Sequence, residues 1–268
     1  TTRKASRIAL NKASLSLKRR ILSLPVDSVR VEEGSKISDL VTSFKNSSIQ
    51  ARNIYKCANV FRKMLQDKTQ PTIYLGLAGP LIAAGLRDII RNMIKFKMVD
   101  IIVATGAIIY QDIYQARGFK HYIGSPDADD RTLDKLRIDR IYDTYVDDEK
   151  FWDTDNWIGR VADTMKPGNY SSREFTDIIA SRLNDENSIV RTAHRYGVPI
   201  FMPALNDSSI GIGLTGHYHR CRKNNKPGVH IDSIQDNYEI TQTIVHSKKT
   251  AAIYIAGGVP KNYINDAV

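Results

Sequence analysis

The sequence predicts an α/β protein built on a Rossmann-like, doubly wound and mostly parallel sheet with helices on both faces. From about residue 50 onward, apolar runs of strand length alternate with helical stretches. These runs are nearly continuous in apolar character, which is typical of a parallel sheet whose two faces are both covered by helices. The alternation of strands and helices in turn indicates repeated βα units.

Five segments are predicted as strands and four as helices. The strands are residues 72–77, 99–104, 198–202, 229–232 and 251–256. The helices are residues 80–97, 106–113, 187–196 and 237–247, and the first has a proline in its first turn, where the missing N–H costs nothing. Residues 118–170 are acidic and aromatic, and we expect an insertion or an irregular stretch over one end of the sheet.

The composition is that of an ordinary globular protein, with 268 residues of which 42% are hydrophobic and 25% charged. No run approaches the roughly 18–20 apolar residues that a membrane span needs, so no membrane contact is expected. The two cysteines, Cys57 and Cys221, are too few for a disulfide framework and lack metal-ligand spacing. We therefore expect a cytoplasmic protein.

The net charge of +10 is concentrated at the start of the chain. Residues 1–26 hold seven basic side chains and no acidic one, interleaved with leucine and isoleucine, so an amphipathic helix is expected there. We assign residues 1–34 to a basic N-terminal arm and residues 35–268 to the α/β domain. The arm is either a solvated extension or a docking segment for an acidic partner or a neighbouring subunit. The rest of the chain is not basic enough to predict direct nucleic-acid binding.

Ligands of open α/β sheets bind beyond the carboxyl ends of the strands. Small residues follow four of the predicted strands, at residues 78–80, 105–107, 203–209 and 256–258. Three of these turns contain glycine and three lead into predicted helix N-termini, an arrangement that suits the phosphates of a dinucleotide. None of them is a G-x-G-x-x-G fingerprint, and glycine also occurs in such turns for geometric reasons alone. A dinucleotide site and a purely structural role both remain open.

Asp207 is the most distinctive residue at these strand ends. A carboxylate in this position can bind a ribose hydroxyl or a cationic substrate, although the run Asp-Ser-Ser also suits a helix N-cap. For the run His217-Tyr218-His219, no nearby Cys, Asp or Glu completes a metal-ligand set, so no metal is expected.

Together these segments resemble the deoxyhypusine synthase family. The matching motifs, in the order and spacing of the family, are YLGLAGPLIAAGLRDII, MVDIIVATGAIIYQDI, VPIFMPALNDSSIGIG, PGVHIDSIQD and AAIYIAGGVPKNYI. The resemblance covers roughly residues 35–268. The motifs GLAGPLIAAGL and GGVPKN look more like the archaeal and bacterial branch than the eukaryotic one.

The resemblance implies an NAD-dependent aminobutyltransferase of hypusine biosynthesis. Such an enzyme oxidises spermidine, passes its four-carbon aminobutyl group to an enzyme lysine as an imine, and then transfers it to a lysine of the translation initiation factor 5A precursor. The resemblance also implies a homotetramer with active sites at subunit interfaces. The alternatives are a related aminobutyltransferase that acts on another amine, similar to homospermidine synthase, and a non-catalytic NAD-binding paralogue.

Site residues follow from the resemblance position by position. The residues expected to contact the cofactor are Gly79, Pro80, Ala83, Thr105, Gly106, Ala107, Asp207, Gly257 and Gly258. The residues expected on the polyamine side are Gln111, Asp112, Ile212 and Asn262.

The polyamine side departs from the eukaryotic pattern of the family. Two adjacent glutamates are replaced by Tyr110 and Gln111, an aspartate by Ile212, and a histidine by Asn262. A neutral amide and an isoleucine do not hold an ammonium group as a carboxylate does. Either other acids, with Asp112, Asp232 and Asp236 as candidates, bind the amine, or the substrate is not spermidine.

The chain ends in GGVPKNYINDAV, at the start of a predicted helix. In the family the catalytic lysine lies in a later S-W-G-K segment that does not occur in this sequence, and Lys261 corresponds to a different family lysine. We therefore expect a truncated or unobserved C-terminal segment. The expectation for these 268 residues is that they contain no catalytic residue and do not complete the transfer.

Overall fold

The computed structural model describes residues 12–267, which form two compact units, one within residues 1–66 and the other within residues 67–268. The first unit contains α1 (Lys12–Ile21), α2 (Ile37–Ser43), a short 3₁₀ helix and α3 (Ile49–Gln66). Among its described residues no apolar side chain is buried. The basic arm predicted for residues 1–34 includes α1, while Arg3, Lys4 and Arg7 lie outside the described residues.

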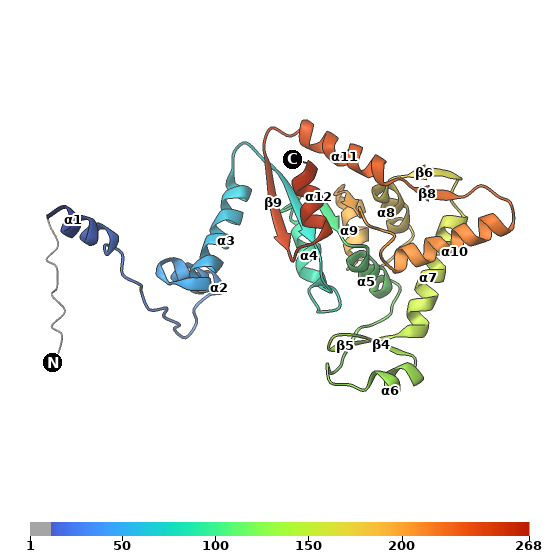
Figure 1. The fold of residues 1–268 in the computed structure, drawn as a ribbon, viewed down its shortest axis with the longest axis horizontal. Coiled ribbons are helices and arrows are strands. Elements are labelled where there is room, and N and C mark those ends of the chain that lie inside the picture. The colour runs from blue at the N-terminus through green and yellow to red at the C-terminus, as the bar shows by residue number, and fades with distance from the viewer. Residues whose placement is uncertain (1–11, 268) are drawn as a thin grey trace, which may run out of the picture. The chain divides into compact units, whose positions relative to one another are not determined.

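The second unit is built on a four-stranded parallel sheet, as the sequence predicted (Figure 1). Its spatial order is β7 (Ile200–Phe201), β2 (Ile101–Ala104), β1 (Thr72–Leu77) and β9 (Thr250–Ile255). In register, Tyr74 of β1 lies beside Ile101 of β2 and Ala252 of β9. All four strands fall within segments predicted as strands, or within one residue of them.

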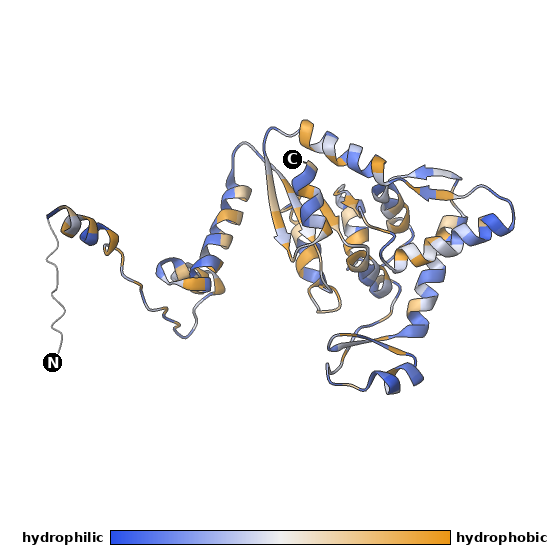
Figure 2. Ribbon diagram, viewed as in Figure 1, coloured by the Kyte–Doolittle hydropathy of each residue, from blue (hydrophilic) through white to orange (hydrophobic). Residues whose placement is uncertain are grey.

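Helices cover both faces of this sheet. On one face Tyr74, Val103 and Phe201 form a buried cluster with Ile240 of α11 (Ser233–Val245) and Ile264 of α12 (Val259–Ala267). The alternate strand residues, which point to the other face, are also buried, and α4 (Arg87–Lys95), α5 (Gly106–Ala116) and α9 (Ile189–Tyr196) pack together on that side. Figure 2 shows the hydrophobic colour concentrated along the inner strands and helices of this unit.

The helix predicted for residues 80–97 is shorter than expected. Residues 80–85 form consecutive turns, in which the Ala84 N–H donates to the Pro80 carbonyl and the Gly85 N–H donates to the Ile82 carbonyl. Gly85 has φ +84°, a left-handed conformation that an α-helix does not contain. The helix therefore begins only at Arg87.

The strand predicted at residues 229–232 is present but does not join the main sheet. It is β8 (Val229–Ile231), which pairs in parallel with β6 (Gly168–Tyr170) in a separate two-stranded sheet. An apolar run in the sequence predicts a buried strand but does not show which strand it pairs with. The partner strand β6 lies about 60 residues earlier in the chain, so the pairing could not be predicted from the local pattern.

The middle segment, residues 118–170, is more regular than predicted. It contains a small antiparallel sheet of β3 (Tyr122–Ile123), β5 (Thr144–Asp147) and β4 (Ile138–Ile141), together with α6 (Asp130–Lys135), α7 (Asp148–Asp163) and β6. The α7 helix crosses α10 (Ser209–Lys223) closely at glycine, because a Cβ added to Gly213 would lie 2.6 Å from the Asp155 carbonyl oxygen. The remaining helix is α8 (Ser172–Ala180). Among residues 12–267, no helix combines the length and apolar character that crossing a membrane requires.

Candidate nucleotide site at the carboxyl edge of the sheet

Backbone hydrogen bonds hold three of the four predicted turns side by side. The Thr105 N–H, after β2, donates to the Leu77 carbonyl at the end of β1 (3.1 Å). The Ala78 N–H donates to the Ile255 carbonyl at the end of β9 (3.1 Å). Parallel strands place all their carboxyl ends at one edge, so the turns that follow β1, β2 and β9 share a single surface.

The fourth turn joins this surface through a close approach at Gly106. A Cβ added to Gly106 would lie 2.2 Å from the Ser208 side-chain oxygen, in the loop that follows β7. Gly106 opens α5 and Ser208 is the N-cap residue of α10, so the beginnings of these two helices meet at this point. Only glycine allows this approach without moving the Ser208 backbone.

The backbone of the turns is exposed and shaped for a ligand that comes close. Gly79 (φ +80°), Ala256 (φ +63°) and Gly258 (φ +75°) are left-handed, and Gly79, Pro80 and Gly257 are exposed. A Cβ on Gly257 would meet no heavy atom within 4 Å. With the N-termini of α5, α10 and α12 at the same edge, backbone N–H groups and positive helix ends face the space where phosphates would lie.

The strand order reverses at this edge. The chain proceeds from β1 to β2 and then to β7 on one side, and β9 returns to the opposite side of β1. The position between the ends of β1 and β9 is therefore a topological switch point, where doubly wound sheets bind their ligands.

Asp207 is exposed in the loop after β7, with its N–H donating to the Ala204 carbonyl (3.0 Å). The N-cap position of α10 is occupied by Ser208 rather than by Asp207. Ala107 is likewise exposed, in the first turn of α5. The Asp207 carboxylate is thus available at the edge of the sheet where a ribose or a cationic substrate would lie.

Two residues expected on different sides of the site contact each other. The Ala83 N–H donates to the Gln111 side-chain oxygen (3.1 Å), and the Gln111 side chain is 5% exposed. Tyr110 is also buried and donates its hydroxyl hydrogen to the Phe151 carbonyl (2.9 Å). Burial, together with the neighbouring Asp155 carboxylate, raises the pKa of Tyr110 above its usual range. The hydrogen bond from the Ala83 N–H means that the buried Gln111 side chain supports the turn that follows β1.

Asp112 has a structural environment that the sequence did not reveal. Its side chain is 0% exposed and accepts hydrogen bonds from Arg87 Nε (2.6 Å), Ser188 Oγ (2.7 Å) and the N–H groups of Ile189 and Val190 (both 3.0 Å). It ties α5 to the N-termini of α4 and α9. Burial alone would lower the pKa of Arg87, but Asp112 and Asp185 raise it above the usual range. These hydrogen bonds explain why a carboxylate is buried at Asp112 without any contact to a substrate.

The other two acids considered for amine binding also have partners in the fold. Asp232 is the N-cap of α11 and accepts from the Ile234 and Gln235 N–H groups. Asp236 is 1% exposed and accepts from the Ser172 N–H (2.8 Å), and burial raises its pKa to about 6. Ile212 (61% exposed) and Asn262 lie on the exposed surface of α10 and α12. Of the residues predicted to bind the polyamine, the two exposed ones, Ile212 and Asn262, are therefore neutral.

The histidine run on α10 contains a buried structural histidine. His217 is 3% exposed; its Nδ1 lies 2.6 Å from Asp163 Oδ1, and its Nε2 accepts from the Val229 N–H (2.9 Å). Cys221 lies one helical turn further on, with Sγ 3.6 Å from Nε2. Within residues 12–267, no group of three or more His, Cys, Asp or Glu side chains is arranged to hold a metal ion.

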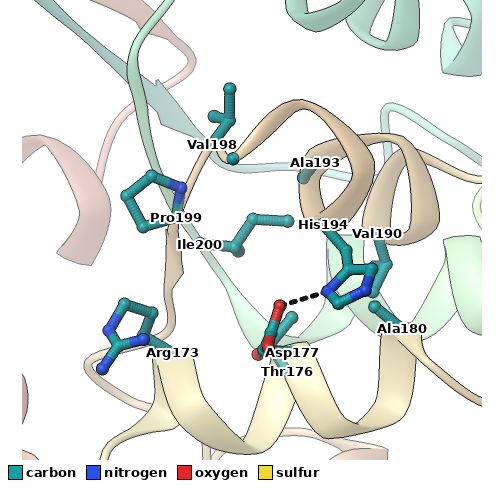
Figure 3. Close-up of a pocket in the computed structure, with 11 residues that line it drawn as sticks. Arg173, Thr176, Asp177, Ala180, Val190, Ala193, His194, Val198, Pro199 and Ile200 are labelled. Carbon is teal, nitrogen blue, oxygen red and sulfur yellow. Dashed lines mark hydrogen bonds and ion pairs between the residues drawn. The ribbon is translucent and has the colours of Figure 1, made fainter.

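A cavity of about 310 Å³ lies between α8 and α9, away from these turns (Figure 3). His194 Nδ1 and Asp177 Oδ1 are 2.5 Å apart at its mouth, and Pro199 and Ile200 belong to its wall. Because β7 begins at Ile200, this cavity lies at the amino edge of the sheet, opposite the four turns.

The fold and the edge geometry define a doubly wound α/β protein in which the turns after four parallel strands meet at one edge of the sheet. The chain belongs to the deoxyhypusine synthase family, because the family model for deoxyhypusine synthase matches residues 39–268.

Archaeal and bacterial proteins are among its relatives. It is 44% identical over 234 residues to a deoxyhypusine synthase-like protein of Chlorobaculum parvum, covering 85% of this chain and 66% of that protein. It is 39% identical over 246 residues to a Methanosarcina acetivorans protein named "Probable deoxyhypusine synthase 2", covering 90% and 68%. The chain thus spans about two thirds of the length of these relatives.

A solved structure shares the fold. It is described as that of a candidate deoxyhypusine synthase of Entamoeba histolytica, and it superposes with a TM-score of 0.65 at 24% identity, covering 87% of this chain and 80% of the other.

Proposed function

We propose that the carboxyl edge of the sheet binds NAD and that the protein is a deoxyhypusine synthase. In this reaction the aminobutyl group of spermidine is transferred to one lysine of the translation initiation factor 5A precursor. The observation that carries the proposal is the meeting of the turns after β1, β2, β7 and β9 at a topological switch point. Family membership supports the reaction class, a group transfer.

The residues of the edge fit a dinucleotide. Gly79 and Gly258 keep Cβ atoms away from the approach to the backbone, and Gly106 lets the beginnings of α5 and α10 come together. The N-termini of α5, α10 and α12 would supply N–H groups for a pyrophosphate. The exposed Asp207 carboxylate would accept from the ribose hydroxyls. Bound NAD would supply hydride acceptance and return, and the protein would orient the polyamine and exclude water.

The remaining partners follow from the family and belong to the same proposal. We expect a cytoplasmic homotetramer whose active sites lie at subunit interfaces. Light scattering on the purified protein tests this, with a mass of four chains expected and a monomer contradicting it.

A second candidate is an aminobutyltransferase that acts on a different amine. It is favoured by the neutral character of Gln111, Ile212 and Asn262 and by the commitment of Asp112 to Arg87. With fewer carboxylates at the expected positions, the ammonium groups of spermidine lose their usual partners.

The two candidates are separated by a transfer assay on the protein expressed from its full reading frame. The mixture contains NAD, labelled spermidine and the translation factor, with Asp207→Ala as the matched variant. We expect label on the factor with the unchanged protein and none with the variant. Label on a free amine instead would favour the second candidate. Bound NAD with no label on any acceptor would indicate a paralogue without chemistry.

A further inference from the structure

A small basic cavity lies between α4 and α9, on the same side of the sheet as α5. It has a volume of about 220 Å³, and the contacts between α4 and α9 hold its two walls together. Four of its lining side chains are cationic, namely Arg91, Lys95, Arg191 and Arg195, and one is acidic, Glu186. A cavity with this excess of positive charge attracts anions.

The single carboxylate does not neutralise the cavity. Glu186 accepts from Arg191 Nη2 (3.0 Å) and Arg195 Nη1 (2.9 Å), so it is shared between two guanidinium groups. Lys95 is exposed at the end of α4. The net charge of the lining is therefore strongly positive.

Arg91 has a donor that the fold leaves unsatisfied. Its side chain is 19% exposed, and its guanidinium bonds Asn187 Oδ1 and lies 3.4 Å from Asp88 Oδ1. Its Nε is buried and has no hydrogen-bond partner among the described residues. Buried guanidinium N–H groups normally have an acceptor, so the fold does not use all the hydrogen-bond donors of Arg91.

The size and position of the cavity define the class of ligand. About 220 Å³ is less than the roughly 300–1,000 Å³ of pockets that hold drug-sized ligands, which favours a small anion over a nucleotide. Guanidinium groups match the oxygens of phosphate, and lysine adds a point charge. Because α4 and α9 end at Lys95 and Tyr196, before β2 and β7, the cavity lies at the amino edge of the sheet, opposite the proposed nucleotide site.

We propose that the cavity between α4 and α9 binds a small, multiply charged anion of the phosphate class, held by Arg91, Lys95 and Arg195. This site is separate from the proposed NAD site and does not depend on it. The alternative is that these basic side chains only stabilise the carboxyl ends of α4 and α9, where positive charge is favourable. In that case the cavity would bind no anion.

Calorimetric titration of the full protein with pyrophosphate, and separately with inorganic phosphate, tests the proposal at constant ionic strength. We expect one saturable site per chain, weakened at least tenfold in the double variant Lys95→Gln/Arg195→Gln. The matched control Lys68→Gln removes an exposed lysine outside the cavity and should leave the affinity unchanged. Glu186→Gln should strengthen binding, because it removes the competing carboxylate.

Three results would overturn the proposal. These are no saturable binding by either anion, equal affinity in the double variant and the unchanged protein, and displacement of bound pyrophosphate by NAD. The last result would place the anion at the proposed NAD site. Failure of NAD to bind would leave the proposal for this cavity intact, so the two proposals are tested independently.

Discussion

Two carboxylates near the carboxyl edge of the sheet lie in opposite environments. Asp207 is exposed in the loop after β7, whereas Asp112 is 0% exposed on α5 and accepts hydrogen bonds from four groups. Both were predicted, from the family resemblance of the sequence, to bind a ligand. Asp207 is therefore available to a ligand, whereas Asp112 holds α4, α5 and α9 together.

The largest expected effect follows from removing the charge of Asp112. Asp112→Asn leaves the Arg87 guanidinium, 13% exposed, without its buried counter-ion. Breaking a buried ion pair from one side costs about 3–5 kcal/mol, so the free energy of unfolding should fall by about that much. Urea denaturation measures it, with Asp207→Asn as the control, for which we expect a change within about 0.5 kcal/mol. Equal losses in both variants would remove the distinction between the two carboxylates.

A third carboxylate, Asp236, extends the comparison to pH. Burial raises its pKa in the folded protein to about 6, against roughly 3.9 when unfolded, so the folded state binds the extra proton between these values. The groups around it are Glu239 on α11, Arg173 and Glu174 on α8, and the buried Tyr263 hydroxyl on α12.

Because the folded state binds this extra proton, the contribution of Asp236 to the free energy of unfolding is greatest below about pH 4. This contribution falls as the pH rises toward 6, by about 2–3 kcal/mol in total. Denaturation at pH steps from 4 to 7 should show this slope in the unchanged protein and a flatter curve in Asp236→Asn. An identical curve in the variant would mean that Asp236 titrates normally.

A smaller effect is expected at the turns. Gly106→Ala places a Cβ 2.2 Å from the Ser208 side-chain oxygen and 2.6 Å from its Cβ, so the loop after β7 must shift. Overpacking of this kind costs about 1–3 kcal/mol, and a one-methyl change beside a part-exposed serine belongs at the lower end. Gly257→Ala is the control, because nothing lies within 4 Å and its φ is not left-handed. Thermal unfolding should distinguish the two variants, and equal melting temperatures would contradict the close approach.

The turns could be predicted from the sequence because they depend on the local chain and on strand direction. A parallel sheet brings the carboxyl ends of all its strands to one edge, so the places of Gly79, Thr105, Asp207 and Gly257 follow from where each strand ends and from its direction. The extent of the helix after β1 could not be predicted as easily, since it depends on the left-handed conformation of Gly85.

The polar side chains could not be assigned in the same way. Asp112 meets Ser188 across 76 residues, and β8 pairs with β6 rather than with the main sheet. The sequence patterns of α5 and α9 indicate helices, but nothing in them shows that Asp112 accepts from the first N–H groups of α9 while it pairs with Arg87. A buried carboxylate and a ligand-binding one look alike in sequence, and only tertiary contacts distinguish them.

The central claim is that NAD binds where the four turns meet, and amide hydrogen exchange with and without NAD tests it most directly. We predict slower exchange in the presence of NAD at residues 78–79, 105–107 and 256–258 and in the loop after β7, with no change along the cavity between α4 and α9. Asp207→Ala should reduce this protection at the same NAD concentration. Protection confined to other segments, or none at saturating NAD, would contradict the account.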